Sequence, residues 1–400
     1  MRFDFTTRLN REGTNALALD AVGKMKGAPK PPKEGYSYLP MWVADMNFIA
    51  CPSITESIIR RAEHPAYGYF LPEKAYLNAV LSWQREHNRM EIPEEALGYE
   101  NGVLGGIASG LRALAAPGEC VLLLSPTYIG FTHSIKDAGY RIILSEMKKD
   151  DTGLFRMDLA DMEAKIQKYH IHVFVSCNPH NPTGRVFTRK ELEEMYALFE
   201  KYRVDVLSDE IWSDILIGGA VHTPLQSISL YAKAHTAAFY APSKTFNLAG
   251  LVGSYHVIYD PALRDRITAA GRKTSYNSGN LLSMAALEGA YSEEGSAWVK
   301  ELNEVLTENV NAAVSMIRNH FRGVLVTPPQ GTYMLFLDCT QYCETSGRTL
   351  DEVLQAGWDV GVGWQDGRPF HGPCHIRMNL ALPTKDVEDA FARLKEHVFL

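Results

Sequence analysis

The amino-acid sequence predicts an α/β protein built around a mostly parallel sheet, and three observations lead to this prediction. Short apolar runs alternate with helical patterns through the middle of the chain, as expected of strands joined by helices. The runs are apolar almost throughout, which is typical of a sheet covered on both faces. Polar motifs follow the runs directly, at the positions where such sheets bind ligands.

Six apolar runs are predicted to be strands of the main sheet: "CVLLLSP" (120–126), "YRIILSE" (140–146), "IHVFVSC" (171–177), "VDVLSDE" (204–210), "HTAAFYAP" (235–242) and "GSYHVIY" (253–259). The segments between several of them have helical patterns, for example "GGIASGLRALAA" and "TRKELEEMYALFEKY". This order of elements predicts a large α/β domain.

The pattern changes near residue 292, where "SAWVKELNEVLTENVNAAVSMIRNHF" predicts a long amphipathic helix. The strands "GVLVTP", "TYMLFLD" and "PCHIRMNLAL" and a final amphipathic helix follow. We therefore expect three parts: an N-terminal segment (1–48) that packs with the small domain, a large domain (49–291), and a smaller α+β C-terminal domain (292–400).

Composition limits the classes of function. The 400 residues carry a net charge of −7 with both signs interspersed, which argues against nucleic acid as a partner. The N-terminus lacks the apolar core of a signal peptide, and no apolar run reaches the ~18 residues that span a membrane. The close pair Cys339 and Cys343 has no second pair or histidine cluster at metal spacing. We expect a cytoplasmic protein with reduced thiols, no metal and no membrane contact.

Three polar side chains follow three predicted strands. Asn181 lies in "NPHNPTG", Asp209 ends "VLSD", and Lys244 lies in "APSKTF". Each has an ordinary interpretation: a turn, a salt bridge or helix cap, and a solvated lysine. Together they indicate pyridoxal 5′-phosphate (PLP), which requires an amine for a Schiff base, a carboxylate for its ring nitrogen and a donor for its ring oxygen.

A phosphate group requires a binding site of its own. "YENGVLGGIASGL" places glycines before a helix, so the backbone N–H groups of Gly102, Val103 and Leu104 are candidates. Ser243 can add a hydroxyl group. Tyr128, which follows a strand in "SPTYIGF", is a candidate to stack on a flat ring, although a packing tyrosine is the common alternative. Arg377, inside the apolar run "HIRMNLAL", suggests either a substrate carboxylate or an internal ion pair.

With these motifs in hand, the sequence resembles the fold-type-I PLP-dependent enzymes of the class I/II aminotransferase superfamily. More narrowly, it resembles the bacterial C–S lyases of cystathionine β-lyase type. The resemblance runs along essentially the whole chain, through "PMWVADMNF", "AYGYF", "NGVLGG", "SPTYIGF", "NPHNPTGRVF", "SDEIWSDIL", "APSKTFNLAGL" and "HIRMNLALP". It implies a central, mostly parallel seven-stranded sheet and a smaller C-terminal domain.

The resemblance also implies roles for individual residues. Lys244 would bind the cofactor covalently and move protons, and Asp209, Asn181 and Tyr128 would hold the ring nitrogen, the ring oxygen and the ring face. Arg377 would bind the substrate carboxylate.

Further roles follow from the same resemblance. Ala44 would lie beside the substrate, with Asn181 and Arg377. Tyr69 would reach the phosphate of the neighbouring subunit, which implies a homodimer with shared active sites.

Several positions depart from the family pattern. Trp212 stands where aminotransferases often have a tyrosine that binds the ring oxygen and where lyases often have a histidine; we include it among the cofactor-binding residues. Ala18 and Leu19 replace a Lys-Trp pair, and Asn47 replaces an aspartate. No arginine follows Lys244 at the spacing that many aminotransferases use for the phosphate.

The function predicted from the sequence is a PLP-dependent β-lyase that cleaves cystathionine- or cystine-like amino acids to a thiol, pyruvate and ammonia. Two alternatives share the cofactor: an aminotransferase, and a PLP-binding regulatory protein with low turnover. The lyase and the aminotransferase share their catalytic residues, so the sequence separates these two poorly.

Overall fold

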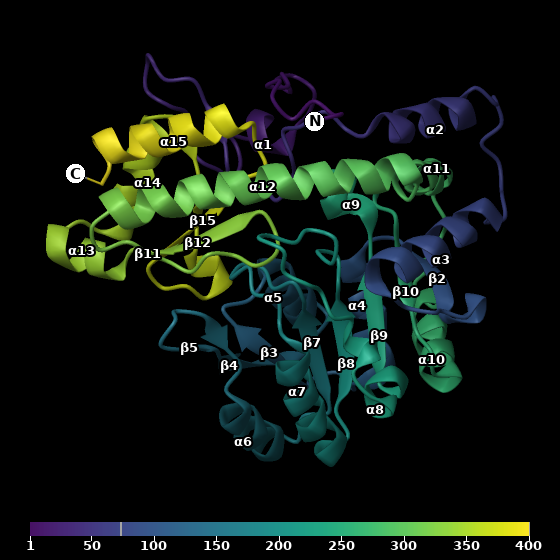
Figure 1. The fold of residues 1–400 in the computed structure, drawn as a ribbon. Helices are drawn as coiled ribbons and strands as arrows, with labels where there is room; N and C mark the ends of the chain where they lie inside the picture. The colour runs from purple at the N-terminus through teal and green to yellow at the C-terminus, as the bar shows by residue number, and fades with distance from the viewer. Residues whose placement is uncertain (73, 400) are drawn as a thin grey trace.

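A computed structural model describes residues 1–72 and 74–399, and its main feature is a seven-stranded sheet (Figure 1). The strand order is β2-β10-β9-β8-β7-β3-β4. The bounds are β2 (Leu97–Glu100), β3 (Cys120–Ser125), β4 (Arg141–Glu146), β7 (Val173–Cys177), β8 (Asp205–Asp209), β9 (Thr236–Tyr240) and β10 (Ser254–Val257). The six strands predicted from apolar runs are all present, and the α/β fold with a seven-stranded sheet is confirmed.

The sheet is parallel except at one strand. β4, β3, β7, β8 and β9 pair in parallel, whereas β10 runs antiparallel to both β9 and β2. The carboxyl ends of β2, β3, β7, β8 and β9 therefore meet at one edge of the sheet. The loops after these five strands carry most of the polar motifs noted in the sequence.

Both faces of the sheet are covered, which explains why the strands are apolar throughout. Along β3, Val121 and Leu123 belong to one core cluster, and Leu122 and Leu124 belong to the other. The first cluster includes side chains from α3 (Lys74–Asn88), α4 (Val103–Leu114), α5 (Ile129–Asp137), α10 (Pro261–Arg272) and α11 (Leu281–Ala290). The second includes α6 (Leu159–Tyr169), α7 (Arg189–Tyr202) and α8 (Leu230–Ala234).

Local signals in the sequence explain where the covering helices begin. α7 starts at a capping box, in which the Thr188 hydroxyl accepts from the backbone N–H of Glu191 and the Glu191 carboxylate accepts from Thr188. α10 begins at Pro261 after the Asp260 cap. These caps satisfy backbone groups that the first helical turn leaves without partners.

A second, four-stranded antiparallel sheet lies beside the first and has the order β11-β12-β15-β14. Its strands are β11 (Leu325–Val326), β12 (Met334–Asp338), β14 (Gln365–Asp366) and β15 (His375–Asn379). The 28-residue helix α12 (Glu293–His320) runs from the region of α11 to this sheet (Figure 1). The other helices in this part are α13 (Thr340–Ser346), α14 (Leu350–Asp359) and α15 (Thr384–His397).

The N-terminal segment includes α1 (Leu17–Asp20) and β1 (Leu39–Pro40), and it contacts the C-terminal part of the chain. β1 pairs in parallel with β13 (Val362–Gly363). The ring of Phe5 packs 5.2 Å from those of Phe48 and Trp298, measured between ring centroids. The domain boundaries at 48/49 and 291/292 stay predictions, and residue 400 of the predicted small domain lies outside the described residues.

Among the residues that the structure describes, no helix is both long enough and apolar enough to cross a membrane.

Replacing Phe5 by alanine is expected to lower the free energy of unfolding by about 3–5 kcal/mol, because it leaves a cavity between Phe48 and Trp298. The midpoint of urea unfolding measures the change. Leu230→Ala, at a side chain that is 87% exposed, is the control and should change stability little. A loss below about 1 kcal/mol in Phe5→Ala would show that the N-terminal segment does not depend on this contact.

Candidate active site

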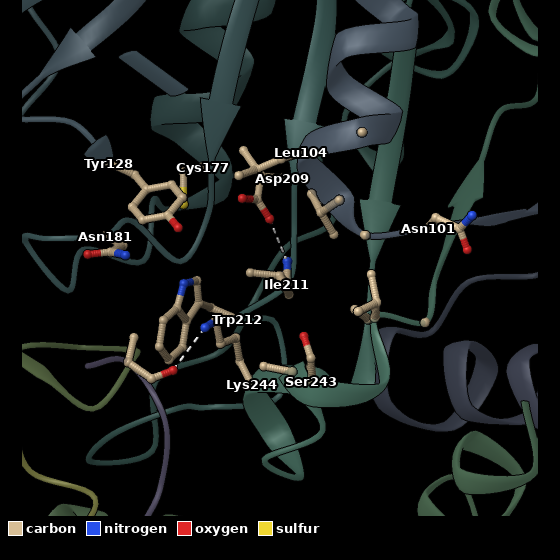
Figure 2. Close-up of a pocket in the computed structure, with 18 residues that line it drawn as sticks. Asn101, Leu104, Tyr128, Cys177, Asn181, Asp209, Ile211, Trp212, Ser243 and Lys244 are labelled. Carbon is tan, nitrogen blue, oxygen red and sulfur yellow. Dashed lines mark hydrogen bonds between the residues drawn. The ribbon is translucent and has the colours of Figure 1, made fainter. Parts of the chain in front are cut away.

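A cavity of about 330 Å³ lies at the carboxyl edge of the seven-stranded sheet (Figure 2). It is lined by residues from the loops after β2, β3, β7, β8 and β9 and by one residue from the N-terminal segment. Ten of the twelve site residues predicted from the sequence line it: Ala44, Gly102, Val103, Leu104, Tyr128, Asn181, Asp209, Trp212, Ser243 and Lys244.

Lys244 follows β9 in the short helix α9 (Pro242–Thr245) and projects into the cavity (Figure 2). Its Nζ atom donates a hydrogen bond to the carbonyl oxygen of Ala44 at 2.8 Å. Removal of the side chain from water, reinforced by the positive charge of Arg377, lowers the pKa of Lys244 to about 8. A substantial fraction of this amine is therefore neutral near physiological pH, as a nucleophile or base requires.

Asp209 ends β8 and faces the same cavity. One carboxylate oxygen accepts from the backbone N–H of Ile211 at 3.1 Å, and no cationic side chain of the described residues lies within ion-pair distance. Burial raises the pKa of Asp209 to about 7, although the Ile211 hydrogen bond and the charge of Lys244 oppose the rise. A buried carboxylate without a cation is costly, so this wall of the cavity is suited to a positively charged ligand.

Arg377 lies behind the cavity wall on β15 and is only 4% exposed. Its guanidinium donates to the Asn181 side-chain oxygen at 3.2 Å, to the Trp42 carbonyl at 3.0 Å and to the Gln365 side-chain oxygen at 2.6 Å. Its Nε has no hydrogen-bond partner, and no carboxylate of the described residues pairs with it. Burial lowers the pKa of Arg377 to about 10. The internal ion pair considered from the sequence is therefore absent from the described residues.

The start of α4 forms another wall. Gly102 precedes this helix with φ +86°, a conformation that favours glycine. The N-cap residue is this glycine, which offers no side chain to the first helical turn. Val103 and Leu104, whose backbone N–H groups belong to that turn, line the cavity. Such an end attracts anions. Among the lining residues that the structure describes, Lys244 carries the only positive charge.

Tyr128 and Trp212 bring aromatic surface to the cavity (Figure 2). Tyr128 is the residue before α5, and a Cβ atom at Gly130 would lie 2.3 Å from its ring, so glycine makes room for the ring. Trp212 is buried and packs at a steep angle against Tyr333, with 4.7 Å between ring centroids. The Nζ of Lys244 lies 5.7 Å from the Trp212 ring.

The structure adds residues that the sequence interpretation missed. Cys177 and Ile211 line the cavity. Cys177 is the last residue of β7 and Ile211 lies two residues after β8, so their positions at strand ends could have identified them in the sequence. The hydroxyl of Tyr333 donates to the Ala44 carbonyl at 3.1 Å, so this oxygen accepts from both Tyr333 and Lys244. No local pattern in "GTYMLFLD" points to that contact, which joins residues 289 positions apart.

Two predicted residues do not line the cavity. Arg377 reaches it through Asn181, as described above. Tyr69 lies in the loop between α2 (Pro52–Ala62) and α3, fully exposed, beside a different surface hollow with Tyr67 and Tyr99. Its predicted contact with a neighbouring subunit stays a prediction.

The departures from the family pattern also have defined places. Ala18 is fully buried, and its carbonyl accepts from the Trp42 indole at 3.0 Å. Asn47 is buried and accepts from Arg11 at 3.0 Å. Both residues contact other residues of the N-terminal segment, and neither lines the cavity.

The chain is similar to known proteins over nearly its whole length. Cystathionine beta-lyase PatB of Bacillus subtilis is 30% identical over 399 residues, which cover 98% of this chain and 99% of PatB. Protein MalY of Escherichia coli is 27% identical, with 98% of each chain covered. The crystal structure of cystalysin from Treponema denticola, which contains a pyridoxal 5′-phosphate cofactor, superposes with a TM-score of 0.90 at 26% identity, covering 99% of this chain and 98% of cystalysin.

The likeness to cystalysin confirms the fold-type-I architecture expected from the sequence. The model of the family described as aminotransferase class I and II matches residues 44–394, which include every lining residue of the cavity. This chain therefore belongs to the aminotransferase class I and II family.

Proposed function

We propose that this protein is a PLP-dependent β-lyase that cleaves the carbon–sulfur bond of amino acids such as cystathionine or cystine. The products are a thiol, pyruvate and ammonia. Membership of the aminotransferase class I and II family supports the cofactor, as does the likeness to cystalysin with its PLP. The relative PatB, named a cystathionine β-lyase, supports the reaction.

The cavity fits the three chemical ends of PLP. The uncapped start of α4 and the Ser243 hydroxyl suit the phosphate. The buried carboxylate of Asp209 lacks a cation, which a protonated ring nitrogen supplies. Lys244, with its lowered pKa, is the amine that binds the cofactor. Each of these three groups of the protein therefore lacks, within the described residues, the partner that PLP supplies: an anion for the helix start, a cation for Asp209 and an aldehyde for Lys244.

The remaining residues of the cavity suit the ring itself. Tyr128 offers an aromatic face for stacking. Asn181 and Trp212 bring N–H groups to the same side of the cavity as Tyr128 (Figure 2), and these groups could donate to a ring oxygen.

The strongest support for an amino-acid substrate comes from Arg377. It is a buried guanidinium whose partners in the described residues are all neutral, and its charge is close enough to lower the pKa of Lys244. A substrate carboxylate can accept from it and supply the missing negative charge. An α-amino acid held in this way places its amino group and α-carbon toward Lys244.

In the proposed reaction, the cofactor and Lys244 have separate roles. When bound, the cofactor supplies an electron sink at the substrate α-carbon. Lys244, freed by the incoming amine, accepts the α-proton at Nζ, and its pKa of about 8 suits both uptake and return of a proton. The thiolate then leaves the β-carbon. The released 2-aminoacrylate hydrolyses to pyruvate and ammonia.

A shared active site in a homodimer is part of this proposal. The loop between α2 and α3 exposes Tyr67, Tyr69 and Leu71, apolar groups that gain from contact with a second copy. Because Lys244 is the only cation among the described lining residues, the phosphate has room for a further donor. We also propose a cytoplasmic location, since all six cysteines are free.

The pure protein loaded with PLP is expected to release pyruvate from cystathionine without an added keto acid. Lys244→Ala should lower the rate by at least about 10³-fold, because it removes the group that moves the proton, and should abolish the visible absorption band of the bound cofactor. A coupled lactate dehydrogenase assay measures the pyruvate. Activity that requires a keto acid would instead establish an aminotransferase.

Asp209→Asn is expected to weaken PLP binding by roughly ten- to hundredfold, since a hydrogen bond to a charged group is worth about 1.5–3 kcal/mol. In the cofactor-free protein, the same substitution is expected to raise the free energy of unfolding. The pKa of Asp209 is about 7 in the folded chain and 3.8 when exposed. Burying this carboxyl group therefore costs most above pH 7, and the cost falls as the pH drops from 7 toward 3.8 and is gone only below 3.8.

Thermal unfolding of the cofactor-free proteins at pH 5 and pH 8 checks this sign. Asp209→Asn should unfold at a higher temperature than the unchanged protein at pH 8, and the difference should be clearly smaller at pH 5. The matched control is Asp214→Asn, at a buried carboxylate that accepts from Trp83 and Thr245 and does not line the cavity; it should keep its affinity for PLP. Unchanged PLP affinity in Asp209→Asn would remove Asp209 from the cofactor site.

Arg377→Lys is expected to raise KM for the amino acid by about ten- to hundredfold with a smaller effect on kcat, because lysine cannot present two parallel N–H groups to a carboxylate. Steady-state kinetics measure the split. The control is Arg185→Lys, at an equally buried arginine that already pairs with Glu191 at 2.7 Å; it should lose stability and keep its KM. Equal KM values in the two variants would exclude Arg377 as the carboxylate site.

A further inference from the structure

Three cysteines meet at one end of the four-stranded sheet, outside the cavity described above. Cys339 follows β12, Cys343 lies one turn later in α13, and Cys374 precedes β15. The backbone N–H of Cys339 donates to the carbonyl of Cys374 at 2.9 Å, and that of Cys343 donates to the carbonyl of Cys339 at 2.9 Å. Backbone hydrogen bonds therefore hold all three residues together.

The close pair of sulfur atoms is not the pair that the sequence suggests. Cys339 and Cys343 are neighbours along the chain, but the sulfur of Cys343 lies 3.6 Å from that of Cys374, 31 residues away. Cys339 is fully buried, whereas Cys343 and Cys374 are partly exposed. The two thiols that face each other are thus also the two that a small molecule can reach.

We propose that Cys343 and Cys374 form a dithiol site that exchanges with low-molecular-weight disulfides and closes a reversible protein disulfide. One thiolate of the pair attacks a sulfur of the small disulfide, releases the first small thiol and forms a mixed disulfide. The second cysteine then attacks the protein sulfur of that mixed disulfide and releases the second small thiol. The small disulfide gains two electrons and the two protein thiols lose two, and the two protons of the protein thiols pass to the two small thiols that are released.

Geometry supports the closing step. A disulfide has a sulfur–sulfur bond of about 2.05 Å, so the two sulfur atoms need to approach by roughly 1.5 Å. Each sulfur moves by rotation about a single side-chain bond, and the backbone hydrogen bond between Cys339 and Cys374 already holds the two segments side by side. Closure therefore requires side-chain rotation more than a change of fold.

Electrostatics set the conditions for the exchange. Burial and the neighbouring Cys374 raise the pKa of Cys343 to about 11, against the favourable charge of Arg348. At neutral pH this sulfur is mostly a thiol, and exchange proceeds through its small thiolate fraction. The exchange is accordingly expected to be faster at pH 9 than at pH 7.

The site is independent of the proposed lyase reaction, because none of the three cysteines lines the cavity that holds Lys244. A protein that acts on cystine-like amino acids meets small disulfides and generates small thiols. Cysteine pairs of this kind in reducing compartments are usually transient bridges rather than structural ones. The fold does not depend on the bridge, since the cysteines are free in the folded chain.

The test uses the full-length protein loaded with PLP and 2-hydroxyethyl disulfide as the probe. This disulfide has no amino group, so it cannot enter the lyase reaction, and pyruvate release from cystathionine is measured separately. After incubation, free thiols are alkylated, and the digest is analysed by mass spectrometry. The expected result is the loss of two free thiols per chain, a linked peptide containing Cys343 and Cys374, and full reversal by dithiothreitol.

Serine variants test the assignment. Cys343→Ser and Cys374→Ser should each abolish the linked peptide and trap 2-mercaptoethanol on the remaining cysteine, whereas the control Cys120→Ser should still form it. Thermal unfolding establishes that each variant is folded. If a variant is not folded, the proposal is tested by whether the unchanged protein yields the peptide that links Cys343 and Cys374. An unchanged thiol count, or a bridge between other cysteines, would overturn the proposal.

Discussion

Buried charge without a compensating partner is the constraint on which the architecture of this site depends. Asp209 and Arg377 are almost fully buried and Lys244 partly so, and none of the three takes part in a salt bridge within the described residues. Each such group costs free energy that the rest of the fold must offset. The apolar sheet, packed on both faces, supplies that stability and keeps the charged atoms from reaching better partners.

The sheet also explains why residues so distant in sequence meet. The strands that end at Ser125, Cys177, Asp209 and Tyr240 run in the same direction, so the residues that follow them gather at one edge. This rule needs only the strand boundaries, and the apolar runs mark those well. For that reason most of the fold could be predicted from the sequence, and so could the meeting of Tyr128, Asn181, Asp209, Ser243 and Lys244 at this edge. The other lining residues came from different signals: the glycines before α4 indicated Gly102, Val103 and Leu104, and the family resemblance indicated Ala44 and Trp212.

What the sequence could not provide is contact between parts of the chain that share no local pattern. β2 has only one buried residue and no apolar run, so its place in the sheet depends on pairing with β10. The contact of Tyr333 with the Ala44 carbonyl, and the approach of Cys374 to Cys343, depend on how the small sheet packs. Periodicity reports which face a residue occupies, but it carries no information about which distant residue it touches there.

The hydrogen bond from Arg377 to Asn181 connects β15 of the four-stranded sheet with the loop after β7 of the seven-stranded sheet, across 196 residues. A carboxylate that binds Arg377 competes with Asn181 for the guanidinium and takes over part of the link between the two sheets. Ligand affinity and the relative placement of the sheets are then thermodynamically coupled, and the coupling is reciprocal. A change in the placement of the sheets that breaks this hydrogen bond then alters ligand affinity, and ligand binding alters the placement by the same free energy.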